Sequence, residues 1–157
     1  VNKYVDDIAI VTEDEISSAI LALIEKQKMI AEGAGAVSVA AAMFNKVPIE
    51  GKNVVCVVSG GNIDVTILDR VIKRGLLTAG RTAQLTIESM DRPGQLFQIS
   101  RIIAEHGGNV IEVHHERRST NTNINGCFMR IDMETRDFNH INKIKEAIKA
   151  AGFNIWE

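Results

Sequence analysis

The stretch NVVCVVSGGNIDVTILDRVIKRG, residues 53–75, decides how the first half of this chain is interpreted. Its apolar run, residues 54–58, is typical of a parallel strand buried on both faces of a sheet, and a helix is predicted after it. The turn between them places glycines and backbone amides at the carboxyl end of the strand, where ligands of open α/β sheets bind. The turn lacks the spacing of a dinucleotide fingerprint or a Walker loop. It therefore predicts a ligand site of another kind, or else only a tight connection, at Ser59, Gly60, Gly61 and Asn62.

The rest of the first half predicts one more strand and two helices. The strand is expected at residues 4–11, and the next helix, residues 12–29, opens with Thr12 and Glu15 at capping-box spacing. A second helix, residues 31–46, is rich in alanine and glycine. Two strands are too few to form a sheet that helices cover on both faces. We therefore interpret residues 1–80 as the tail of a larger α/β domain.

Small residues at the start of that second helix need an explanation. Each glycine inside a helix costs about 1 kcal/mol relative to alanine, so Gly33 and Gly35 are expected to have a packing or ligand role. Glu32 is interpreted either as a carboxylate at the helix start or as a group that lines a pocket.

The second half predicts a complete small domain after a linker at residues 78–81. Asp91 is expected to cap its first helix, Pro93 to lie in the first turn and Gly107 to mark the exit. The element order is βαββαβ, which is the ferredoxin-like plan. Its strands are expected at residues 82–89, 109–119, 124–135 and 153–156, and its helices at residues 91–108 and 137–152.

Side-chain patterns predict which faces of this domain are buried. The third strand alternates, with Arg130 and Asp132 facing outward. The last helix carries an apolar stripe. The residues expected inside are Cys127, Met129, Ile131 and Met133 on the strand and Ile141, Ile144 and Ile148 on the helix.

Histidine and cysteine usage does not predict a metal site. His114 and His115 are adjacent in a strand, so they point to opposite faces and cannot chelate one ion together. Cys56 and Cys127 both lie in predicted strands and are interpreted as buried thiols in a reducing compartment.

Composition narrows the possible partners and location. The net charge of -2 and the pI near 6.1 offer no footprint for nucleic acid or an anionic membrane. No apolar run approaches the ~20 residues of a membrane span, and no signal peptide is recognised at the start, so a cytoplasmic location is expected. The first residue, Val1, suggests a processed or truncated chain.

Three stretches together resemble one family. The motif IAEGAGA (residues 30–36) is followed by GKNVVCVVSGGNIDVTILDRVIKRGL (residues 51–76) and by a βαββαβ unit that contains DRPGQL and GGN. Together these stretches resemble the carboxyl-terminal part of a threonine dehydratase, or threonine ammonia-lyase, with one ACT regulatory domain. The resemblance implies that residues 1–80 are the end of a catalytic domain of the tryptophan-synthase-β-like fold and that residues 81–157 are the ACT domain.

The resemblance also implies a cofactor, pyridoxal 5'-phosphate. The serine that matches Ser59 hydrogen-bonds the pyridine nitrogen in this family, and Gly60, Gly61, Asn62 and Glu32 match its surroundings. By the same resemblance, the parent enzyme is expected to deaminate L-threonine to 2-oxobutanoate and ammonia. Nothing here matches the family's Schiff-base lysine, phosphate loop or substrate loop, and the lysines present (Lys26, Lys28 and Lys52) are on other elements. The chain alone is therefore predicted to be inactive.

For the ACT domain, the resemblance implies a dimer with amino-acid effectors at its interface. The loop residues Asp91, Arg92, Gly94 and Gln95 are expected to face Asn109 of the partner subunit. Helix-start amides suit the effector's carboxylate, while Asp91 and Asn109 suit its ammonium group. Isoleucine or valine is the first expectation, because threonine dehydratase feeds isoleucine and other branched-chain synthesis. Serine or threonine is the second.

Two alternatives stay open at this point. One is a free-standing amino-acid-binding ACT protein, which the unpaired strand at residues 54–58 disfavours. The other is a related serine dehydratase or racemase, which only the substrate loop would distinguish.

Overall fold

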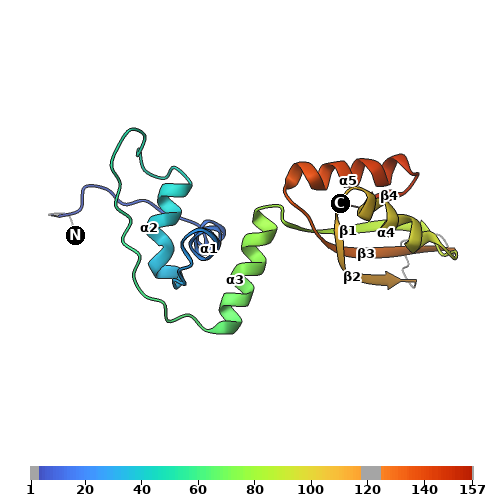
Figure 1. Cartoon of the computed structure of the whole chain (residues 1–157), viewed down its shortest axis with the longest axis horizontal. Coiled ribbons are helices and arrows are strands. Elements are labelled where there is room, and N and C mark those ends of the chain that lie inside the picture. The colour runs from blue at the N-terminus through green and yellow to red at the C-terminus, as the bar shows by residue number, and fades with distance from the viewer. Residues whose placement is uncertain (1–3, 118–124, 157) are drawn as a thin grey trace. The chain divides into compact units, whose positions relative to one another are not determined.

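The structure, a computed structural model, describes residues 4–117 and 125–156. It divides into two compact units, Val1–Thr78 and Ala79–Glu157. Each unit is described by itself, with its elements labelled in Figure 1. Among the described residues, no helix combines the length and the apolar character needed to cross a bilayer.

The first unit is built from helices. Helix α1 (Glu13–Ala22) continues into a π-helical turn (Leu23–Gln27), and α2 (Gly33–Met43) and α3 (Val65–Thr78) follow. Helix α1 contacts both α2 and α3. The core contains mostly small side chains, which allow the helices to approach closely. Its buried members are Ala19, Ile20, Leu23, Ala31, Ala36 and Ala40.

The capping box at the start of α1 is confirmed. The Glu15 N–H donates to the Thr12 hydroxyl at 3.3 Å, and the Thr12 N–H donates to Glu15 Oε2 at 2.8 Å. Glu15 also pairs with Lys46 Nζ at 2.7 Å. Hydrogen bonding to Lys46 first, and to Thr12 second, lowers the pKa of the Glu15 carboxyl group.

The two strands expected in the first unit do not form, and this prediction is wrong for the described residues. Residues 4–11 and 53–58 contain neither helix nor strand. Ile10 is 83% exposed and Val55 is 88% exposed. A strand exists only where a neighbour completes its ladder of hydrogen bonds, and neither segment has such a neighbour among the described residues.

The second unit is a four-stranded antiparallel sheet with strand order β2-β3-β1-β4. The βαββαβ order and the ferredoxin-like plan are confirmed. The turn expected at residues 120–123 lies outside the described residues. The elements are β1 (Thr82–Met90), α4 (Gln95–Glu105), β2 (Asn109–Glu116), β3 (Gly126–Glu134), α5 (Phe138–Ala150) and β4 (Asn154–Trp156).

One face of this sheet forms the core with the two helices, and α5 runs along the sheet (Figure 1). All seven residues expected inside on β3 and α5 are buried, whereas Arg130 is exposed. Asp132 also faces away from the core but is only partly exposed. The burial pattern predicted from alternation is therefore confirmed.

The start of α4 differs from the prediction. The helix begins at Gln95, and its N-cap is Gly94 at φ 89°, a left-handed conformation that favours glycine. Asp91 is therefore not the cap and Pro93 is not in the first turn. Asp91 lies in a tight turn that the Arg92 N–H closes by donating to the Met90 carbonyl at 2.9 Å, and Pro93 lies in the next turn, where the Gln95 N–H donates to the Arg92 carbonyl at 3.4 Å. The predicted exit is right, since Gly107 follows the helix at φ 83°.

Candidate functional site

The turn at residues 59–62 packs against the start of α2. The Glu32 N–H donates to the Gly60 carbonyl at 3.1 Å. A Cβ atom on Gly35 would lie 1.8 Å from the Ser59 carbonyl oxygen, so backbone occupies the space that a side chain would need. Gly35 therefore has the packing role that its helix position predicts. Gly33 has none, because its Cβ would make only an ordinary contact with Ile16 at 3.8 Å.

Glu32 joins the helix start to this turn. It is the N-cap residue of α2, and its side chain makes no capping hydrogen bond. Its carboxylate lies beside Gly60, where a Cβ would come within 2.5 Å of Glu32 Oε1. Gly60 also has φ 75°, so both its backbone and its surroundings favour glycine. The structure thus brings Glu32 and the predicted turn together, and both interpretations of its carboxylate stay open.

The polar end of the turn faces solvent. Ser59 and Asn62 are exposed, and the Ser59 hydroxyl makes no hydrogen bond within the described part of the chain. Beyond the turn, Asp64 accepts a hydrogen bond from the Thr66 N–H at 2.7 Å, just before α3 begins. Hydrogen bonds from Thr66 lower the pKa of Asp64. We did not single out Asp64 from the sequence, although Asp followed two residues later by Thr at a helix start signals a cap.

The second candidate site is a pocket of about 330 Å³ beside the turn between β1 and α4. It brings together four of the predicted effector residues, and its further lining residues include the polar side chains of His115 and Arg117. Asp91 pairs with Arg117 through Oδ2 at 3.1 Å and with His115 through Oδ1 at 3.8 Å. The side chain of Gln95 is held in place by a hydrogen bond, because the buried Ser89 hydroxyl donates to Gln95 Oε1 at 2.8 Å. The predicted members are Asp91, Arg92, Gly94 and Gln95.

Asn109, the fifth predicted effector residue, lies at the opposite end of the sheet. It pairs with Glu134 in the ladder and donates to Glu134 Oε2 at 2.8 Å. The Asp91 N–H instead donates to the Asn125 carbonyl at 2.8 Å, beyond the end where Met90 pairs with Gly126. One chain therefore does not bring Asn109 to this pocket.

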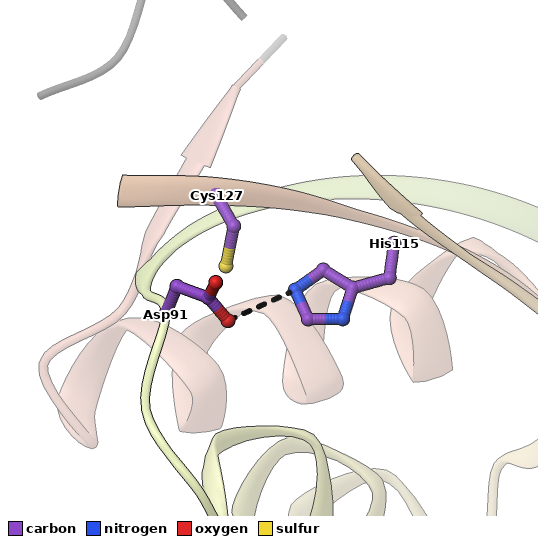
Figure 2. A group of neighbouring side chains, drawn as sticks. All are labelled: Asp91, His115 and Cys127. Atoms are coloured by element: carbon purple, nitrogen blue, oxygen red, sulfur yellow. Dashed lines mark ion pairs between the residues drawn. The ribbon is translucent and has the colours of Figure 1, made fainter. Parts of the chain in front are cut away.

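The two adjacent histidines do point to opposite faces, as predicted. His114 lies opposite the exposed Arg130 and pairs with Glu112 at 3.1 Å. His115 lies opposite the buried Met129, and its ring approaches Asp91 and Cys127 (Figure 2). Burial, and then the charge of Asp91, raises the pKa of the Cys127 thiol.

Comparisons with known proteins match both units. Residues 1–60 match the family described as pyridoxal-phosphate dependent enzyme, and residues 83–153 match the ACT domain. The L-threonine ammonia-lyase of Thermotoga maritima is 44% identical over 155 residues, which are 99% of this chain and 38% of that protein. The L-threonine ammonia-lyase of Geobacter sulfurreducens is 40% identical over 153 residues, with 98% and 38% coverage. The chain thus spans less than half the length of these relatives.

Proposed function

Residues 1–60 of this chain belong to the pyridoxal-phosphate dependent enzyme family and residues 83–153 form an ACT domain, and on this basis we propose that the chain is the carboxyl-terminal, regulatory portion of an L-threonine ammonia-lyase. Such an enzyme converts L-threonine to 2-oxobutanoate and ammonia in the cytoplasm. A free-standing ACT protein is not favoured, because the similarity to the relatives continues through the first unit.

The observation that carries the proposal is the state of residues 54–58. This segment has the apolar sequence of a buried strand, yet Val57 is 73% exposed and Val55 more so. An exposed run of apolar side chains is unfavourable in water, because burying it would remove that apolar surface from the solvent. A sheet contributed by the rest of a catalytic domain would pair and cover the segment.

The turn at the end of this segment fits one wall of a pyridoxal 5'-phosphate site. The hydroxyl of Ser59 is exposed and without a partner in the described residues, so it can hydrogen-bond the pyridine nitrogen. Gly60 and Gly61 carry no side chain that would cover the turn, the Glu32 carboxylate lies against Gly60, and Asn62 follows in the same turn. When bound, the cofactor supplies an electron sink for cleavage at the substrate's α and β carbons. A neutral hydroxyl does not hold the ring nitrogen protonated as a carboxylate would, which moderates that sink.

This wall lacks the group that would link the cofactor covalently. No lysine of the chain occupies the context of a Schiff-base lysine. The chain incubated with pyridoxal phosphate and threonine should therefore form no 2-oxobutanoate above the background of cofactor alone. Product above that background would contradict the assignment of this chain to the part without the catalytic lysine.

A fusion tests the proposed function directly. The part of the Thermotoga maritima enzyme that this chain does not cover is placed ahead of Val1, and cofactor binding and 2-oxobutanoate formation are measured. The fusion should bind the cofactor and consume L-threonine. Ser59→Ala should keep the cofactor but lower kcat roughly 30- to 1000-fold, the effect of about 2 to 4 kcal/mol lost in the transition state.

Ser18→Ala is the matched control, because Ser18 only donates to the Asp14 carbonyl within α1. Its kcat should stay unchanged. A fusion that binds the cofactor but forms no product from threonine would overturn the proposed reaction. An unchanged kcat in Ser59→Ala would mean that the turn is only structural.

For the ACT domain we propose an amino-acid effector at a two-fold dimer interface. Asp91 and Arg117 offer opposite charges in one pocket, which suits the ammonium and carboxylate groups of an amino acid. The amides at the start of α4 add to the carboxylate side. Asn109 would come from the partner subunit, which explains its distance from the pocket in one chain. Isoleucine or valine is the expected effector, with serine or threonine second.

A further inference from the structure

Three side chains that ligate metals converge at one end of the ACT sheet. Asp91 follows β1, His115 lies on β2 and Cys127 lies on β3. A carboxylate oxygen, a ring nitrogen and the sulfur lie within 4.8 Å of one another. Figure 2 shows all three side chains pointing toward one place between the strands.

The convergence follows from strand register. Cys127 lies opposite Ser89, and Asp91 is two residues beyond Ser89 along the chain. His115 lies opposite Met129, two residues beyond Cys127. All three therefore occupy the face of the sheet that the helices cover, near its end.

We propose that Asp91, His115 and Cys127 form a three-ligand site for a divalent transition-metal ion, for which Zn²⁺ is the matching probe. A thiolate, an imidazole and a carboxylate are the ligands that Zn²⁺ prefers. Mg²⁺ and Ca²⁺ select oxygen ligands instead, so the thiol and imidazole discriminate against them.

The three ligand atoms need to move only slightly closer together to coordinate one ion. Tetrahedral coordination at bond lengths of about 2.0 to 2.3 Å places ligand atoms roughly 3.5 Å apart. The Asp91–His115 separation is already 3.8 Å, and the widest separation is at most 4.8 Å. Asp91 lies on a turn and its side chain is 39% exposed, so rotation of its carboxylate can close the remaining gap. A fourth position then stays open on the side of the pocket that Asp91 and His115 line.

Charge at the site is consistent with a bound cation. Arg117 balances the negative charge of the Asp91 carboxylate, and a bound metal ion would take over this role. Binding displaces the thiol proton of Cys127 to solvent, because the thiolate is the ligand. Asp91 is also the residue expected to hold an effector's ammonium group, so the test omits amino acids.

The other face of the sheet offers a built-in comparison. Glu112, His114 and Asp132 also lie within ligand reach of one another, but they include no sulfur, and His114 and Glu112 are exposed. A thiolate signal therefore identifies the site at Cys127. Cys56, the second thiol of the chain, hydrogen-bonds the Ser38 carbonyl at 3.6 Å in the first unit.

The test uses the full chain without an affinity tag, titrated with Co²⁺ for spectroscopy and with Zn²⁺ for calorimetry. We expect one equivalent to bind with a thiolate-to-cobalt charge-transfer band. Cys127→Ser should remove the band, whereas Cys56→Ser should keep it. Even residues that only orient a ligand change metal affinity about 10- to 100-fold, so His115→Ala and Asp91→Asn should weaken binding at least about tenfold.

His114→Ala is the matched control and should bind the ion as the parent chain does. Since His115 is exposed, His115→Ala should fold even where loss of the buried thiol disturbs the core. Trp156 fluorescence checks the fold of each variant. Absence of the band in the parent chain, its loss in Cys56→Ser, or equal weakening by His114→Ala and His115→Ala would overturn the proposal.

Discussion

The ring of His140 is buried in the ACT unit, and both of its nitrogens are hydrogen-bonded. Nδ1 accepts from the Arg136 N–H at 3.0 Å, so the ring proton lies on Nε2, which donates to the His106 carbonyl at 2.7 Å. The ring therefore links the segment before α5 to the end of α4. No sequence pattern singles out His140, because one of its two partners, the His106 carbonyl, is 34 residues away along the chain.

His140→Ala should lower the free energy of unfolding of the ACT unit by about 2 kcal/mol, since a buried ring is removed and the part-buried Arg136 N–H and His106 carbonyl lose their partner. The matched control is Asn139→Ala, an exposed neighbour on the same helix, which should change it by less than about 0.5 kcal/mol. Urea unfolding followed by Trp156, the chain's single tryptophan, measures both. Equal effects would show that the His140 hydrogen bonds contribute nothing beyond helix propensity.

Gly33 and Gly35 have the same residue type in one helix but should respond in opposite ways to alanine. Gly35→Ala drives a methyl group into the Ser59 carbonyl, so the turn must move away from α2. In Gly33→Ala the added methyl group makes only an ordinary van der Waals contact with Ile16, so the substitution should be neutral or should stabilise the fold by up to about 1 kcal/mol.

Hydrogen exchange at the Glu32 amide measures this difference, because that amide donates across the helix–turn contact. Protection should fall in Gly35→Ala and persist in Gly33→Ala. Persistence in both variants would mean that the turn does not need the space at Gly35.

At the scale of one element, α1 is stabilised by charges at its first turn. The pKa of Glu15 is lowered by Lys46 and by Thr12, so its contribution is present above the unfolded pKa and is lost as pH falls through the folded pKa. Acidification should therefore loosen α1 at the capping box.

Carboxyl chemical shifts in NMR titrations test this order of causes. Glu15 should titrate below its ordinary value, and Lys46→Ala should raise its pKa more than Thr12→Ala does, because alanine at residue 12 keeps the backbone N–H that donates to Glu15. Lys52→Ala, a charge removal beyond α2, serves as the control and should leave the Glu15 titration unchanged. A larger effect from Thr12→Ala would reverse the assignment.

At the scale of the whole molecule, the ACT unit has its own core of sheet and helices, so its response to effectors can be measured by itself. An effector at about 100 times its dissociation constant should stabilise this unit by about 2.7 kcal/mol. Thermal melts followed by Trp156, with each amino acid in turn, should show a rise with isoleucine or valine. Asp91→Ala and Asn109→Ala should each abolish it.

Sedimentation tests the dimer that this effector site requires. Since Asp91 and Asn109 lie at opposite ends of one sheet, a monomer cannot bring them to one ligand. A chain that stays monomeric at high concentration, or a melt that no amino acid shifts, would contradict the effector site. A mixture of Asp91→Ala and Asn109→Ala chains can form one intact site per heterodimer and should recover part of the shift.

The sequence by itself determined the ACT fold. Alternation on β3 and the apolar stripe on α5 are local patterns with periods of 2 and 3.6 residues, so the buried face can be read from them. Helix ends were predicted where a local signal exists, as at Thr12 and Gly107. The start of α4 was missed, because the left-handed Gly94 and not Asp91 ends the turn.

Only the tertiary structure decided what depends on neighbours. Residues 54–58 carry the pattern of a strand, but a strand needs a partner, and the described chain contains none for it. A register shift between Val110 and Glu112 sets the face of the sheet on which His115 lies, and no residue type in the sequence predicts this shift. The grouping of Asp91, His115 and Cys127 follows from that register. Long-range pairing brings these residues together, whereas the sequence specifies only their local periodicity.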